Sequence, residues 1–281
     1  MRAKRRIIIL AVLMGLLPCL GYAQKTKSHI HPEILSSVKA FAPGKPFTVG
    51  IHFTMDPDWH IYWINPGDSG LATSVKWVGH PPINFSPLEW PAPEKIILPA
   101  ILTYGYSKEV VLLSEATVTP SFSGKSITLK ADVAWLACHD LCVPGKARIV
   151  REIPAAKGKA VRNSQEIRTI ERYQARVPQD YQGWEISARY SDQFALIHFK
   201  PNHEFPIKSI YFFPENSDFF KHEAGEKFRS NQAGFEVLLR RSKIFTGDLE
   251  KLEGVLAIDT GSAMVYDQVR LKPEKSGIQE F

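Results

Sequence analysis

The stretch Phe47-Thr48-Val49-Gly50-Ile51-His52-Phe53 begins directly after Pro46 and places a large apolar residue at every second position. This alternation is typical of a β-strand that buries one of its two faces. Similar short segments follow at Val110 to Leu113, Ser126 to Val133 and Ala147 to Ile153, and proline and glycine separate them. Short alternating segments with frequent turn residues predict an all-β sandwich or barrel.

The chain changes character near Ser164 to Ala175, where Glu and Arg recur at helical spacings up to Val177-Pro178. We expect a short helix that ends before this proline and connects two β-rich regions. The second region begins near Trp184, and its candidate strands are Glu185 to Tyr190, Phe194 to Phe199, Ser209 to Phe213, Phe235 to Leu239 and Leu252 to Asp259. The expected division is a signal peptide at 1–23, a first β-domain at 24–160, a helical connector at 161–178 and a second, smaller β-rich domain at 179–281.

The N-terminus is typical of a secretory signal peptide. Basic residues within Met1 to Arg6 precede an apolar run from Ile7 to Leu17, which is shorter than the roughly 20 residues that span a bilayer. Small residues before Gln24 suit a signal peptidase, so we expect export and cleavage after Ala23. The alternatives are a retained signal anchor and a lipid on Cys19.

Composition and motif spacing exclude several function classes. The formal net charge of +6 comes mostly from the expected signal peptide, and no Lys/Arg stripe with interleaved aromatic residues follows, so we expect no nucleic-acid partner. His198 and His203 lack the spacing of a metalloprotease helix, and Glu89 and Glu94 lie among prolines rather than as an acid/base pair. No Gly-x-Ser-x-Gly sequence organises a hydrolase triad.

The segment most informative about chemistry is Ala134-Trp135-Leu136-Ala137-Cys138-His139-Asp140-Leu141-Cys142-Val143-Pro144-Gly145. If Cys19 leaves with the signal peptide, this segment holds the only cysteines of the chain, in a compartment where disulfides form. Strand-like residues on both sides would oppose the cysteines across a hairpin, at a separation of roughly 4.5–5.5 Å between Cα atoms that a disulfide accepts. So small a ring constrains the unfolded chain little, which favours thiol–disulfide exchange over a purely stabilising role.

The two ionisable residues that follow Cys138 have opposite effects on the stability of its thiolate. A protonated His139 would stabilise a thiolate on Cys138, whereas the carboxylate of Asp140 would oppose it. The sequence therefore leaves open which cysteine attacks.

The segment Trp135 to Gly145 resembles the redox signature of the N-terminal periplasmic domain of DsbD-type thiol:disulfide interchange proteins. It is more similar to their ScsB branch, in which three residues separate the cysteines ahead of a proline. Other segments occur in the order of the family, namely Trp59 to Gly70, Trp90 to Pro93 and Tyr104 to Tyr106. The resemblance covers roughly Ile34 to Pro154 well and the second region only loosely.

This resemblance implies an immunoglobulin-like β-sandwich in 24–160 with Cys138 and Cys142 as the redox pair, and no organic cofactor or metal. It implies a periplasmic protein-disulfide reductase, in the loose sense, that takes electrons from a membrane-embedded DsbD/CcdA-type donor and passes them to client thiol proteins. The family is associated with cytochrome c biogenesis and its ScsB branch with copper tolerance. Because the chain ends at Phe281 without a membrane domain or a thioredoxin-like domain, we expect the donor to be a separate protein.

The resemblance also implies which residues surround the cysteines. The family shields its pair with a loop that ends in Tyr-Gly, and Thr103 here stands where the DsbD domain has a shielding aromatic residue. Core packing is the alternative for each aromatic residue of the set. The residues expected to line or cap the site are Trp59, Tyr62, Tyr104, Gly105 and His139.

Two other functions are compatible with the sequence. Cys138 and Cys142 are soft ligands suited to Cu(I), with His139 as a third, but no second Cys/His pair completes a structural zinc site. His29 and His31 form either a small metal site or part of a polar tail. The other possibility is a non-catalytic interaction module in which the disulfide is structural.

Overall fold

A computed structural model describes the protein as almost entirely β-strand. Within the described residues the one helix is α1 (Ile167–Gln174), and no helix there is long and apolar enough to cross a membrane. The expected signal peptide, its cleavage site and Cys19 lie outside these residues. The described ranges are 28–78, 83–99, 101–180, 183–202, 207–216, 219–221, 226–231, 234–243, 247–278 and residue 280.

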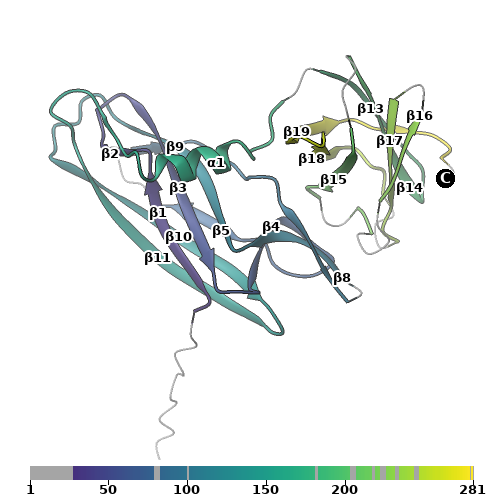
Figure 1. Cartoon of the computed structure of the whole chain (residues 1–281), viewed down its shortest axis with the longest axis horizontal. Helices are drawn as coiled ribbons and strands as arrows, with labels where there is room; N and C mark the ends of the chain where they lie inside the picture. The colour runs from purple at the N-terminus through teal and green to yellow at the C-terminus, as the bar shows by residue number, and fades with distance from the viewer. Residues whose placement is uncertain are drawn as a thin grey trace, which may run out of the picture.

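Two antiparallel sheets form the N-terminal part of the molecule (Figure 1). The first sheet has the order β1 (Ile30–Ser36), β3 (Pro46–Met55), β9 (Glu109–Val118) and β6 (Ile83–Phe85). The second has the order β11 (Cys142–Pro154), β10 (Ser126–Cys138), β4 (His60–Gly67), β8 (Ile101–Ser107) and β7 (Glu94–Leu98), with β5 (Ser74–Trp77) paired to β10. Strands β2 (Val38–Ala40) and β12 (Val161–Arg162) pair separately. The predicted all-β sandwich is confirmed.

The core of this sandwich follows the period-two pattern of the strands. Phe47, Val49, Ile51 and Phe53 of β3 are buried, whereas His52 between them lies on the outer face. The partner sheet contributes apolar residues of β10 to the same hydrophobic cluster, among them Leu129. Burial of one large apolar side chain stabilises the fold by about 1.5–3 kcal/mol, so these alternating residues explain why the two sheets pack face to face.

The longest pairing in the molecule is the β10–β11 hairpin. Its register runs without interruption from Ser126 opposite Pro154 to Cys138 opposite Cys142. The predicted strands Ser126 to Val133 and Ala147 to Ile153 both lie within it and extend to the turn. This ladder fixes the position of both cysteines at one end of the sandwich.

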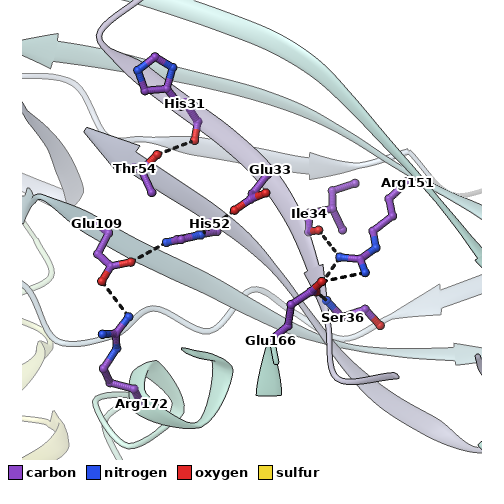
Figure 2. A network of polar contacts seen from close by, with 10 residues as sticks. All are labelled: His31, Glu33, Ile34, Ser36, His52, Thr54, Glu109, Arg151, Glu166 and Arg172. Carbon is purple, nitrogen blue, oxygen red and sulfur yellow. Dashed lines mark hydrogen bonds and ion pairs between the residues drawn. The ribbon is translucent and has the colours of Figure 1, made fainter. Parts of the chain in front are cut away.

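Helix α1 docks on the outer face of the first sheet through charged groups (Figure 2). Arg151 of β11 donates to both carboxylate oxygens of Glu166 at 2.6 and 3.0 Å, and the Ser36 amide donates to the same carboxylate at 2.8 Å. Burial opposes ionisation of Glu166, but Arg151 and Ser36 outweigh it and hold its pKa below the usual range. The residue directly before the helix is therefore tied to both sheets.

The same face carries a second chain of ionic contacts. His52 lies between two carboxylates, with Nδ1 3.0 Å from Glu33 and Nε2 2.7 Å from Glu109. Arg172 of α1 donates to the other oxygen of Glu109 at 2.8 Å, as Figure 2 shows. A helix is thus present in the predicted stretch, and it lies against the sheet rather than in solvent.

The C-terminal part of the chain forms two further sheets. One has the order β16 (Lys227–Asn231), β17 (Gly234–Arg240), β14 (Phe194–Pro201), β13 (Trp184–Tyr190) and β20 (Glu274–Lys275), and the other has β15 (Ser209–Pro214), β18 (Leu252–Asp259) and β19 (Met264–Leu271). All five candidate strands of the second region are confirmed. The pattern missed β16, β19 and β20, which carry more polar residues.

Strand β15 joins the two parts of the molecule. Phe213 packs edge-on against Trp63 and Tyr104, with ring centroids 6.3 and 5.2 Å apart, and belongs to the hydrophobic cluster of the sandwich. The side chain of Asn65 donates to the carbonyl of Pro214 at 2.7 Å. Apolar residues of the second region therefore belong to the hydrophobic core of the sandwich. The expected domain boundaries at 160 and 178 stay a prediction.

Candidate redox site

The two cysteines close the end of the β10–β11 hairpin. Cys138 is the last residue of β10, Cys142 is the first of β11, and they form a disulfide with 4.2 Å between their Cα atoms. The intervening turn is held by a hydrogen bond from the His139 amide to the Leu141 carbonyl, 3.3 Å long. The geometry predicted from the spacing, two opposed residues of an antiparallel pair, is present.

The environments of the two cysteines differ sharply. Cys138 is 2% exposed, whereas Cys142 is classed among the exposed residues. Leu141, next to Cys142, is 76% exposed. Thiol–disulfide exchange requires access of the attacking group to a sulfur, so Cys142 is the sulfur that a second protein can reach.

A third residue lies in line with the cysteines. His60, the first residue of β4, is the Cα partner of Cys138, which in turn is the partner of Cys142. Directly opposed residues of antiparallel strands project their side chains to the same face, with Cβ atoms roughly 4.5–5.5 Å apart. Ala137 and Ile61, the chain neighbours of Cys138 and His60, belong to the sandwich core. The His60–Cys138–Cys142 row therefore lies on the outer face of the second sheet.

His60 is buried although it is on that outer face. It is 4% exposed, and its Nε2 atom has no hydrogen-bond partner. Burial lowers its pKa below the usual value, and the positive field of His139 lowers it further. The ring of Tyr62, two residues along β4, lies edge-on with its centroid 5.2 Å away. A neutral imidazole is thus held beside the buried cysteine.

Residues 68–73 pack on this face over Tyr62. Gly70 has φ of +123°, and a Cβ atom there would lie 2.3 Å from Cε1 of Tyr62, so only glycine permits this approach. Asp68 exchanges two hydrogen bonds with the backbone of Leu102, both 2.9 Å long. Sequence reasoning missed this cover, although the turn residues of Gly67-Asp68-Ser69-Gly70 were a signal for it.

Gly105 lies next to the site and Tyr104 does not. Gly105 is the Cα partner of Tyr62, and a Cβ atom there would lie 2.1 Å from the carbonyl oxygen of Ile61. Successive side chains of a strand alternate in face, so Tyr104 points away from the cysteines. It is 1% exposed, and its hydroxyl lies 3.0 Å from that of Tyr211 in β15. The structure thus places the expected capping tyrosine at the junction with the second region.

Trp59 and His139 do lie together beside the turn. Their ring centroids are 5.9 Å apart, and the ring of His29 stacks on Trp59 with centroids 3.8 Å apart. His29 and His31 contact opposite oxygens of Asp56 at 3.0 and 3.1 Å. In the described part of the chain, no group of three or more His, Cys, Asp or Glu residues is arranged to hold a metal ion.

The site is a partly shielded disulfide at the end of a hairpin in an immunoglobulin-like β-sandwich. Residues 31–154 match the family described as "Thiol:disulfide interchange protein DsbD, N-terminal". The resemblance of this segment to the DsbD N-terminal domain, predicted from the motifs, is therefore confirmed. No curated protein sequence matches the chain.

Comparison with solved structures extends the likeness beyond that segment. The crystal structure of the N-terminal periplasmic domain of ScsB from Proteus mirabilis superposes with a TM-score of 0.67 at 15% identity, over 89% of this chain and 95% of that one. At this identity the likeness concerns the fold alone. An endo-fucoidan hydrolase of glycoside hydrolase family 107 superposes with a TM-score of only 0.21 at 8% identity, over 87% of this chain and 29% of that one.

Proposed function

We propose that this protein is a periplasmic thiol–disulfide exchange protein that relays electrons from a membrane-embedded DsbD/CcdA-type reductase to client proteins. The observation that carries the proposal is the asymmetry of the pair, with Cys142 exposed at the hairpin end and Cys138 buried behind it. Such asymmetry suits a two-step exchange, because one sulfur meets the client and the other is protected until it resolves the intermediate.

The electron balance of this relay is as follows. The thiolate of Cys142 attacks the client disulfide, a Cys142–client mixed disulfide forms, and the first client sulfur leaves as a thiolate. Cys138 then attacks the Cys142 sulfur, which restores the Cys138–Cys142 disulfide and releases the second client thiolate. Two electrons pass to the client, and the membrane donor returns two electrons to the pair by the reverse exchange.

The compartment and the pathway belong to this proposal. The sequence predicts export, and the ScsB domain of similar fold is periplasmic by its description. Cytochrome c biogenesis and copper tolerance are the pathways in which clients are to be sought.

Equilibration of the chain from Gln24 to Phe281 with glutathione buffers of graded potential tests the proposal. An exchange-active pair has its midpoint at roughly −270 to −120 mV, whereas a structural disulfide lies below about −300 mV. We expect a midpoint in the upper range and rapid exchange. A midpoint below −300 mV with slow exchange would leave the disulfide a structural one.

Trapping of a client by single-cysteine variants shows which sulfur attacks the client disulfide and which resolves the mixed disulfide. With Cys138→Ala the mixed disulfide on Cys142 cannot be resolved and should accumulate. The matched Cys142→Ala variant should trap little, because the remaining Cys138 thiol is buried. Reconstitution of each variant with a purified CcdA-type membrane donor shows whether the same sulfur receives the electrons.

A further inference from the structure

The imidazole of His60, on the outer face of the second sheet, takes no part in the exchange steps above. Nε2 of His60 is buried and has no hydrogen-bond partner. A buried imidazole nitrogen without a partner costs about 1–3 kcal/mol, so its retention calls for a role. The strand register sets His60 directly opposite Cys138.

We propose that His60 accepts the proton of the Cys138 thiol when Cys138 resolves a mixed disulfide on Cys142. The inference rests on the proposed function and assigns a residue to its second step. While the disulfide is intact, Cys138 has no proton to share and Nε2 of His60 has no partner. Reduction creates a buried thiol on the same face, at the roughly 4.5–5.5 Å between Cβ atoms of opposed residues.

Three polar side chains near His60, on β8, on the hairpin turn and on β4, have other partners or are unsuited to this exchange. On β8 its Cα partner is Ser107, whose hydroxyl donates to Glu94 at 2.6 Å. On the hairpin turn, His139 lies 3.1 Å from Asp140. On β4, Tyr62 is buried and burial raises the pKa of its hydroxyl. The Cys138 thiol is the group that the strand register places directly opposite His60.

The proposed step balances in protons and electrons. The Cys138 proton passes to Nε2 of His60, and the resulting thiolate attacks the sulfur of Cys142. The Cys138–Cys142 bond forms, the Cys142–client bond breaks, and the client sulfur leaves with the electron pair. The His60 imidazolium then returns the proton to that client thiolate. Burial and the field of His139, which lower the pKa of His60, keep its imidazole neutral and able to accept at neutral pH.

Reaction of the fully reduced protein with a dithiobis-nitrobenzoate disulfide separates the two steps, because each releases one coloured thionitrobenzoate. The first release reports attack by Cys142 and the second reports resolution by Cys138. We expect His60→Gln to leave the first phase unchanged and to shift the pH profile of the second phase upward by about one unit. At pH 6 the variant should then have tenfold less Cys138 thiolate, but a thiolate of higher pKa is also more nucleophilic. The two effects partly cancel, so the second phase should be roughly threefold slower.

The matched control is His198→Gln. His198 lies on β14 in the C-terminal part of the chain, so this change should not alter either phase. A second-phase pH profile unchanged by His60→Gln would overturn the inference while the proposed function stands. A wild-type protein that releases no second thionitrobenzoate would instead overturn the proposed function itself. If His60→Gln does not fold, the His60 imidazole is titrated by NMR in the oxidised and reduced wild type, and an identical titration in both states would refute the role.

Discussion

Replacement of Gly70 by alanine should release the cover of the redox face. The new Cβ would lie 2.3 Å from Cε1 and 2.5 Å from Cδ1 and Cζ of Tyr62, whereas carbon atoms pack at about 3.5–4.0 Å. Tyr62 is 2% exposed and has little room to move. The overlap costs about 1–3 kcal/mol and the positive φ a similar amount, so we expect the free energy of unfolding to fall by about 3 kcal/mol.

Two assays measure this effect. Denaturant unfolding of the oxidised protein gives the change in free energy, with the exposed Gly158→Ala as the matched control, because a Cβ there meets nothing within 4 Å. Alkylation of reduced Cys138 in a Cys142→Ala background reports access to the face that 68–73 covers. Each 1.4 kcal/mol of lost local stability raises the open population about tenfold, so the alkylation rate should rise at least tenfold. A Gly70→Ala protein as stable as Gly158→Ala, with Cys138 no more reactive, would refute the packing of 68–73 on Tyr62.

Three other changes test the framework around the site. Gly105→Ala would place a Cβ 2.1 Å from the carbonyl of Ile61 and should separate β4 from β8, seen as loss of folded protein in thermal unfolding monitored by circular dichroism. Arg151→Met should reduce the free energy of unfolding at pH 7 by about 2 kcal/mol, because Glu166 loses its charged partner. The folded-state pKa of Glu166 is lowered, so the extra stability of the wild type is present above the unfolded-state pKa of Glu166. It should vanish as pH falls through the folded-state pKa. Burial raises the pKa of Glu226 to about 8 in the folded protein. Between the unfolded-state pKa of Glu226 and pH 8 the unfolded chain therefore binds fewer protons than the folded one, and the free energy of unfolding should fall as pH rises. Glu226→Gln should remove this pH dependence, and an unchanged pH dependence in urea titrations would contradict the raised pKa.

Local pattern was enough to predict the strands and the opposition of Cys138 and Cys142. The alternation in Phe47 to Phe53 depends only on which side chains face the core, and β3 buries those that the pattern selects. The spacing of Cys138 and Cys142 limits them to a tight turn, so their opposition follows from the hairpin alone. These features depend on residues close in the chain, which a sequence displays directly.

The surroundings of the pair depend on register between distant strands. A shift by one residue turns a side chain to the opposite face, and this decides that Gly105 lies beside Tyr62 while Tyr104 points to the second region. The nearness of His60 to Cys138 likewise requires β4 and β10 to be adjacent. No local pattern contains that pairing.

The sequence by itself therefore determined the β-rich architecture, the presence of a short helix after the first β-rich region, the resemblance of 31–154 to the DsbD N-terminal domain and the disulfide-forming cysteines. Only the tertiary structure decided which sulfur is exposed, which residues cover the other, and which histidine stands beside it. The physical reason is that strand propensity and turn chemistry act over a few residues, whereas burial and face are set by contacts between strands far apart in the chain.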